Sequence, residues 1–318
     1  MWTEGPRVLL AGATGTIGRA TAQALMGQGV RPLCLVRPGR AHALPPGCQS
    51  FEADVTDEAR LADLPHIDAV ISCLASRTGV PADAWAVDYA AQRVLRKAAQ
   101  KAGAQHFVLL SAICVQKPLL EFQRAKRAFE AELAESELTC SIVRPTAFFK
   151  SLSGQLARVQ AGKPFLLFGD GTLTACKPIS DADLAAYLVR CLRDADLHNR
   201  ILPIGGPGPA MTPRAQGEAL FAACGKPARF RHVPVRLMDG IIAGLSLAGR
   251  LSPAARDKAE LARIGRYYAT ESMLVLDPAT GRYDADATPE TGNDTLPEFY
   301  AKLARGEATV DLGAHAVF

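Results

Sequence analysis

A strand, a glycine-rich turn and a helix follow one another in residues 8–28, and this unit constrains the fold more than any other part of the chain. Its first residues form an apolar run, as in a buried parallel strand. Gly12, Gly15 and Gly18 then recur at every third position, a spacing that lets the backbone turn tightly and approach a pyrophosphate at a helix N-terminus. Glycines also serve tight turns that bind nothing. The strand before and the helix after favour a dinucleotide site.

The predicted phosphate-binding turn supplies most of the expected cofactor contacts. These come from six residues of the turn and of the helix start: Gly12, Thr14, Gly15, Thr16, Ile17 and Gly18.

Strands and helices alternate through the following residues. Short apolar runs at 33–36, 50–53, 69–74, 107–110 and 139–143 are separated by stretches of helical character, among them 83–102 and 119–135. Such alternation is typical of a doubly wound, Rossmann-type parallel sheet in the α/β class. We therefore expect a Rossmann domain at 1–145 and a smaller substrate-binding part at 146–318. Within the second part, residues 181–205 are expected to return to the Rossmann sheet.

Composition excludes several classes of protein. The eight cysteines are dispersed with no C-x-x-C pair, so neither a disulfide framework nor a metal site is indicated. A net charge of +4, spread along the chain, argues against nucleic acid as a partner. No secretory or transit signal is evident, which predicts a cytoplasmic protein. The sequence leaves the oligomeric state open.

Residues 237–251 form the most apolar window of the chain. The window is too short, and too often interrupted by glycine, to span a bilayer. A buried or half-buried helix is the favoured interpretation, and a helix at a membrane interface or over a substrate is the alternative. Peripheral association with a membrane is therefore left open.

The residue after the second strand indicates which cofactor is used. Arg37 lies about twenty residues beyond the glycine turn, where an NADH-selective site carries an acid for the ribose hydroxyl. A guanidinium there favours the extra phosphate of NADPH, although a solvated loop charge is the alternative. Strand ends should line the rest of the cofactor site. The residues expected there are Asp54, Val55, Cys73 and Ala75.

A lysine on the helix at 119–135 is the candidate catalytic residue. Phe122 and Lys126 reproduce the Tyr-x-x-x-Lys spacing of short-chain dehydrogenases with phenylalanine in place of tyrosine, and Ser111 precedes them. Phenylalanine cannot donate a proton to a carbonyl oxygen, so ordinary ketone reduction is disfavoured. Lys126 is expected to bind the nicotinamide ribose or to supply a proton, and Ser111 to contact the cofactor. The alternatives are a surface lysine and a serine that caps a strand.

The first half of the chain resembles the atypical short-chain dehydrogenases of the NmrA-like or isoflavone-reductase-like branch. The resemblance rests on the glycine turn, on the Val-Arg-Pro-Gly sequence at 36–39 and on the helix without tyrosine. The second half is similar to a narrower family, the NADPH-dependent 8-vinyl reductases of divinyl chlorophyllides. That similarity rests on residues 175–180, 202–208 and 265–278, together with 119–126 and 295–300.

The second resemblance implies reduction of a vinyl group on a magnesium tetrapyrrole in chlorophyll or bacteriochlorophyll synthesis. Charge developing in such a reaction spreads into the macrocycle, so no tyrosine donor is required. Aromatic side chains could form a wall for the flat ring, although each could equally be a core residue. The candidates are Phe148, Phe149, Phe165, Tyr267 and Tyr268. Two alternatives are an NADPH-binding regulator without activity and an ene or benzylic-ether reductase of phenolic compounds.

Overall fold

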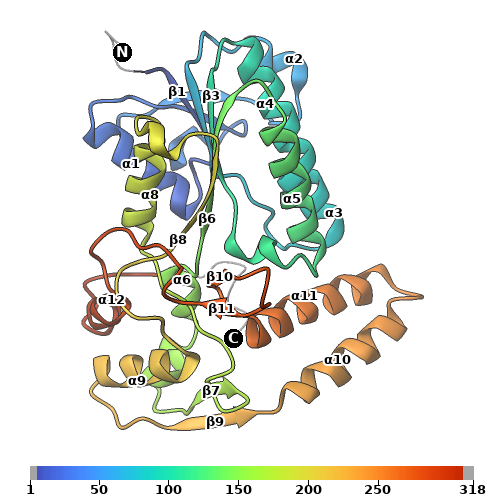
Figure 1. The fold of residues 1–318 in the computed structure, drawn as a ribbon, viewed down its shortest axis with the longest axis vertical. Coiled ribbons are helices and arrows are strands. Elements are labelled where there is room, and N and C mark those ends of the chain that lie inside the picture. Colours follow the sequence, from blue (N-terminus) through green and yellow to red (C-terminus); the bar gives the residue numbers. More distant parts are fainter. Residues whose placement is uncertain (1–5, 311–318) are drawn as a thin grey trace. The chain divides into compact units, whose positions relative to one another are not determined.

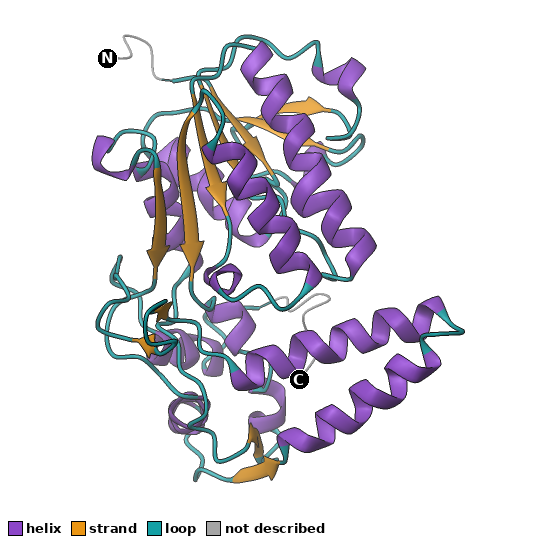
Figure 2. Cartoon of the chain, turned by 45° about the vertical axis from the view of Figure 1, so that its right-hand side comes forward, coloured by secondary structure: helices purple, strands orange, loops and turns teal. Residues whose placement is uncertain are grey.

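A seven-stranded sheet forms the centre of the fold in a computed structural model, which describes residues 6–310. Its strands lie in the order β3-β2-β1-β4-β5-β6-β8. The strand pairs from β3 to β6 are parallel, and Figure 2 shows β8 running in the same direction as β6. This is the expected doubly wound α/β sheet. The strands are β1 (Val8–Ala11), β2 (Leu33–Val36), β3 (Gln49–Glu52), β4 (Ala69–Ser72), β5 (His106–Leu110), β6 (Thr139–Pro145) and β8 (Arg200–Ile204).

Helices cover both faces of this sheet. Figure 1 shows α1 (Thr16–Gly27) and α8 (Asp181–Arg190) together on one face. The other face carries α2 (Glu58–Leu61), α3 (Pro81–Ala84), α4 (Gln92–Lys101) and α5 (Glu121–Ala134). The strands bury continuous apolar runs because both of their faces are covered. Leu9, Val70 and Phe107 lie in that core without solvent exposure.

The helix expected at 83–102 contains a π-helical segment, Trp85–Ala91, between α3 and α4. A π-helix closes its hydrogen bonds one residue later than an α-helix, so the segment shifts the faces that later residues present. Such segments occur often at functional sites.

The chain divides into two compact units. The first comprises the chain up to Arg77 together with Ala82–Pro145 and Asp181–Leu202. The second comprises Thr78–Pro81, Thr146–Ser180 and the chain from Pro203 onward. Helix α8 and most of β8 thus lie in the first unit, although they follow a long segment of the second.

The second unit is built mainly from helices. Its strands are β7 (Phe165–Phe168), which pairs in parallel with β9 (Phe230–Val233), and β10 (Val275–Leu276), antiparallel to β11 (Tyr283–Asp284). Its helices are α6 (Phe149–Leu152), α7 (Leu156–Gln160), α9 (Pro213–Ala223), α10 (Val235–Ala248), α11 (Pro253–Thr270) and α12 (Leu296–Ala304). A separate apolar core, centred on Phe221 and Tyr300, holds β7, α9 and α12 together.

The most apolar window of the sequence forms α10, and no residue of this helix is buried. The helix is half-buried, as the favoured interpretation allowed, because one face packs against α11 while the other is exposed. Among the helices of residues 6–310, none combines the length and the apolar character that a membrane span requires.

Candidate cofactor and active site

The glycine turn between β1 and α1 has a backbone that only glycine allows. Gly12 has a φ of +78°, and a Cβ there would lie 2.6 Å from the carbonyl oxygen of Cys73. A Cβ on Gly18 would lie 2.1 Å from the Gly12 oxygen. Side chains at either position would therefore separate β1, α1 and the end of β4. The close packing brings the start of α1 directly against the carboxyl edge of the sheet.

The start of α1 fits the pyrophosphate of a dinucleotide. Gly15 is the N-cap, its N–H donates to the Gly12 oxygen over 3.0 Å, and the first turn holds no acidic residue. Thr14, Gly15 and Thr16 are exposed, whereas Ile17 and Gly18 are buried against the core. A phosphate approaching this surface would thus meet an uncapped helix N-terminus with a favourable dipole and no repelling carboxylate.

Arg37 follows β2 directly and is exposed. Hydrogen bonds from Thr56 lower the pKa of Asp54, two residues beyond β3, and the Arg37 guanidinium adds a smaller effect in the same direction. The next residues are held in place by Glu52, which accepts a hydrogen bond of 2.6 Å from the Gly39 N–H. The structure thus brings Arg37 and Asp54, both predicted cofactor contacts, to neighbouring strand ends.

The remaining predicted contacts at the strand ends differ in accessibility. Val55 is partly buried against the sheet core, Cys73 is partly exposed and Ala75 is exposed. The thiol group of Cys73 is itself buried, which raises its pKa to about 12, so the thiol is neutral. Residue 73 approaches the glycine turn through its backbone carbonyl.

Ser111 ends β5 inside a buried polar cluster. Its hydroxyl donates to Glu130 on α5, and Glu130 also forms an ion pair with Arg144 on β6. Only 5% of Ser111 is exposed. Its contact with a cofactor therefore stays a prediction, while its structural role in joining β5 to α5 is visible.

Lys126 pairs with a carboxylate from the π-helical segment. Its Nζ lies 2.9 Å from Oδ1 of Asp88, whose side chain is completely buried. Asp88 also accepts hydrogen bonds from the N–H and the hydroxyl of Ser76, in the loop after β4. The pair fixes the lysine ammonium beside the carboxyl end of the sheet, and 12% of the lysine side chain remains exposed.

Asp88 is the residue of this site that the sequence did not reveal. The available signal was an acid inside the helical stretch at 83–102, but such acids are common on solvated helix faces. The π-helical turn decides which face Asp88 occupies, and helical periodicity does not predict such a turn.

Phe122 lies one turn before Lys126 on α5 and is 8% exposed. The position of the usual tyrosine therefore carries a buried apolar side chain, without a proton to donate.

The five aromatic candidates for substrate contact, all in the second unit, fall into two groups. Phe149 and Phe165 lie in the core, where Phe149 stacks on Phe299 at 5.3 Å, and Tyr267 is only 4% exposed. Phe148 is partly exposed and Tyr268 is 45% exposed. A wall that included Phe149 or Phe165 would require this core to open. We therefore retain Phe148 and Tyr268 as candidates.

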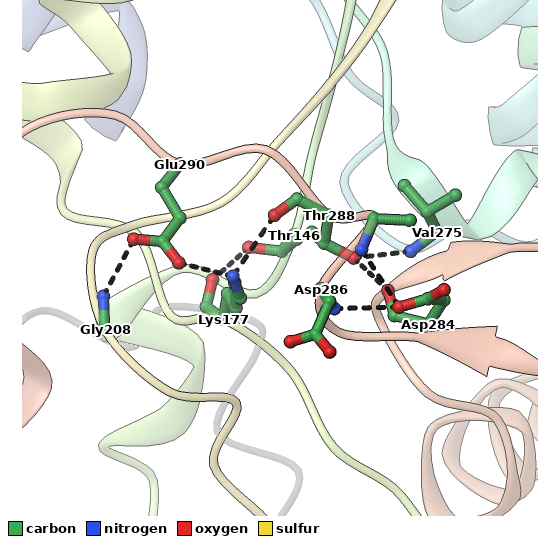
Figure 3. A network of polar contacts seen from close by, with 9 residues as sticks. Thr146, Lys177, Gly208, Val275, Asp284, Asp286, Thr288 and Glu290 are labelled. Carbon is green, nitrogen blue, oxygen red and sulfur yellow. Dashed lines mark hydrogen bonds and ion pairs between the residues drawn. The ribbon is translucent and has the colours of Figure 1, made fainter.

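A polar network in the second unit joins three of the segments that carry the narrower sequence resemblance, 175–180, 202–208 and 265–278 (Figure 3). Lys177 is nearly buried, and its ammonium donates to the Thr288 carbonyl over 3.2 Å and pairs with Glu290. The ion pair lowers the pKa of Glu290, which also accepts from the Gly208 N–H. Thr146, which follows β6, donates to the Lys177 carbonyl. Lys177 thus connects the loops after β6 and β8 with residues 288–290.

Comparisons with known proteins agree with this geometry. The profile of an NAD(P)H-binding family matches residues 12–195. The divinyl chlorophyllide a 8-vinyl-reductase of Zea mays is 50% identical over 98% of this chain and 82% of its own length. The Arabidopsis thaliana protein of the same name is 47% identical over 96% and 79%.

Solved structures share the fold. An NADPH-dependent quinone oxidoreductase of Escherichia coli, solved with NADPH, superimposes with a TM-score of 0.68 at 20% identity. The superposition covers 93% of this chain and 99% of that one. At this identity the likeness establishes the Rossmann-type fold alone. The sequence relationship is more specific, because it extends through both units at about half identity. The chain belongs to the divinyl chlorophyllide a 8-vinyl-reductase family.

Proposed function

We propose that this protein uses NADPH to reduce the 8-vinyl group of a divinyl chlorophyllide or protochlorophyllide to an ethyl group, in chlorophyll or bacteriochlorophyll synthesis. Family membership over nearly the whole chain is the observation that carries the proposal. The site is compatible with it, because Phe122 replaces the hydroxyl donor that carbonyl reduction requires.

NADPH supplies a hydride when it is bound. The start of α1 would hold the pyrophosphate and Arg37 the ribose phosphate, since both are exposed and the first turn of α1 holds no acidic residue. Guanidinium groups bind phosphate through two parallel hydrogen bonds, so Arg37 would select NADPH over NADH.

Lys126 would bind the nicotinamide ribose from the carboxyl edge of the sheet. Asp88 keeps the ammonium in one place, so the lysine does not have to be ordered when the cofactor arrives. Phe122 would contribute an apolar surface on the same helix. Reduction of the vinyl group adds one hydride and one proton across the double bond, and the proton would come from water or from the Lys126 ammonium.

The state of the cysteines supports a location in a reducing compartment. All eight cysteines are free thiols, and most are buried. This state is typical of proteins in a reducing compartment such as the cytoplasm.

Incubation of the protein with NADPH and each divinyl pigment, followed by absorption spectra and product chromatography, tests the proposal. We expect NADPH oxidation and an ethyl product with at least one of the two pigments. A regulator without activity would bind NADPH but leave every pigment unchanged. An ene or benzylic-ether reductase would instead oxidise NADPH only with a phenolic substrate.

A further inference from the structure

The outward face of α10 is apolar and uncovered. Residues 237, 240, 241, 244, 247 and 248 follow one another at helical spacing and are all exposed. Leu237 is 56% exposed, Ile241 48% and Leu247 64%. Beyond the helix end, Leu251 is 94% exposed. An apolar stripe of this length normally faces a core or a partner.

The other face of α10 is already occupied by α11. Figures 1 and 2 show the two helices as an antiparallel pair that extends from the rest of the second unit. Arg266 of α11 pairs with Asp239, and Arg263 donates to the Ser246 hydroxyl over 2.7 Å. The hairpin is therefore held together by its inner face, and the apolar outer face takes no part in holding it.

Positive charge is concentrated around this stripe. The two helices and their connection, residues 235–270, contain six lysines and arginines against three acidic residues, a net charge of +3, whereas the whole chain has +4. Near the helix connection, Arg250, Arg256 and Arg263 line an open hollow of about 310 Å³ together with Ser246 and Gly249. Arg256 also donates to the Gly249 carbonyl over 3.4 Å. The Arg263 guanidinium is paired with Glu260 over 3.1 Å, so Arg250 and Arg256 are the cations of this hollow that are suited to a phosphate group.

We infer that the α10 face and the arginine hollow dock the protein on an anionic phospholipid bilayer. The leucines of the outer face enter the boundary between headgroups and acyl chains, while the arginines bind lipid phosphates. A second copy of the chain fits this face less well. A symmetric contact would bring two surfaces of the same positive charge together. The inference goes beyond the proposed function and does not depend on turnover.

Co-sedimentation of the full-length protein with vesicles tests the docking surface. Vesicles of phosphatidylglycerol mixed with phosphatidylcholine should bind the protein, and vesicles of phosphatidylcholine alone should bind it about tenfold less. Raising the salt concentration should weaken the binding, because ions screen exposed charges.

Two variants and a matched control locate the contact. The double variant Leu247→Glu with Leu251→Glu should bind anionic vesicles at least ~10-fold more weakly, because each leucine leaves the bilayer for water. Arg250→Glu should lose roughly tenfold by reversing one charge at the surface. Leu173→Glu, at an apolar position 51% exposed outside the hairpin, should bind like the wild type. Circular dichroism and thermal unfolding verify that all three variants fold.

Four outcomes would overturn the inference. The first is equal binding of both vesicle types, and the second is equal binding by folded hairpin variants and the Leu173→Glu control. The third is a dimer, seen without vesicles, that the leucine variant abolishes, since it would assign the face to a second copy. Inorganic phosphate at constant ionic strength should displace the protein only weakly. Complete displacement by phosphate would show that the hollow binds free anions instead of a lipid surface.

Discussion

Arg37 is the residue on which the choice between NADPH and NADH depends. Arg37→Glu should weaken NADPH binding by about tenfold to a hundredfold and leave NADH binding nearly unchanged, because a charge-assisted phosphate contact becomes a repulsion. Titration of cofactor fluorescence measures both affinities. Arg31→Glu is the control, since Arg31 is an exposed arginine just before β2. Equal losses of affinity for the two cofactors would mean that Arg37 contributes only a general positive charge and does not recognise the ribose phosphate.

Asp88 is predicted to act through Lys126. Lys126→Met should reduce turnover strongly, and Asp88→Asn should reduce it less, because the amide still accepts from Ser76 while the charge that holds the lysine is lost. A double-mutant cycle on kcat and on the KM for NADPH checks the coupling. Once Lys126 is methionine, Asp88→Asn should have little further effect on either constant. Additive losses would make Asp88 a purely structural residue.

The side chain at position 122 distinguishes an enzyme for vinyl reduction from one for carbonyl reduction. Phe122→Tyr should leave vinyl reduction the same or slower, because its hydroxyl would lose water at a position only 8% exposed. A general acid in reach of the reacting group contributes about 10²-fold or more. Single-turnover rates of vinyl reduction therefore show whether the reaction uses a general acid at this position, with Phe122→Leu as the apolar control. A large acceleration in the tyrosine variant would mean that the protein lacks an acid it could use.

At the scale of elements, sequence patterns located most of the Rossmann sheet. The run at 33–36 is a strand with the expected bounds, residues 200–204 form a strand within the stretch expected to return to the sheet, and the helix expected at 119–135 is α5. Strands of a parallel sheet are recognisable because both faces are buried and the apolar run is continuous. The helix at 83–102 was recognised without its π-helical segment, so the contact between Asp88 and Lys126 was missed.

The second unit was less predictable because side chains of one type serve different purposes there. Phe149 and Phe165 are aromatic, as residues that line a site for a flat ligand often are, yet they pack in the core with Phe299 and Phe230. The apolar window at 237–251 has the composition of a core helix, yet one face of α10 is exposed. Local sequence reports how apolar a segment is, and tertiary contacts decide what covers it.

At the scale of the whole molecule, stability should fall in weak acid. Burial, and then the neighbouring His198, lowers the pKa of His106 from 6.5 to about 4. His106 therefore stays neutral in the fold but binds a proton in the unfolded chain below 6.5. The stabilisation from the neutral ring is complete above that pH, declines as the pH falls and is lost by about pH 4, a change of at most about 3 kcal/mol.

Urea unfolding near neutral pH and at about pH 4.5 measures this loss, and His106→Gln removes the titrating group. We expect the variant to be less stable at neutral pH and to lose less stability on acidification than the wild type. An identical pH dependence in the two proteins would assign the acid sensitivity to other groups.

The most direct test of the proposed reaction follows the hydride. With NADPH that carries deuterium at the transferred position and a divinyl chlorophyllide as substrate, mass spectrometry of the pigment should find one deuterium in the new ethyl group for each cofactor oxidised. The same reaction with unlabelled NADPH in heavy water should place one solvent deuterium in that ethyl group. Oxidation of labelled NADPH without deuterium in the pigment, or a pigment that keeps its vinyl group, would contradict the assignment.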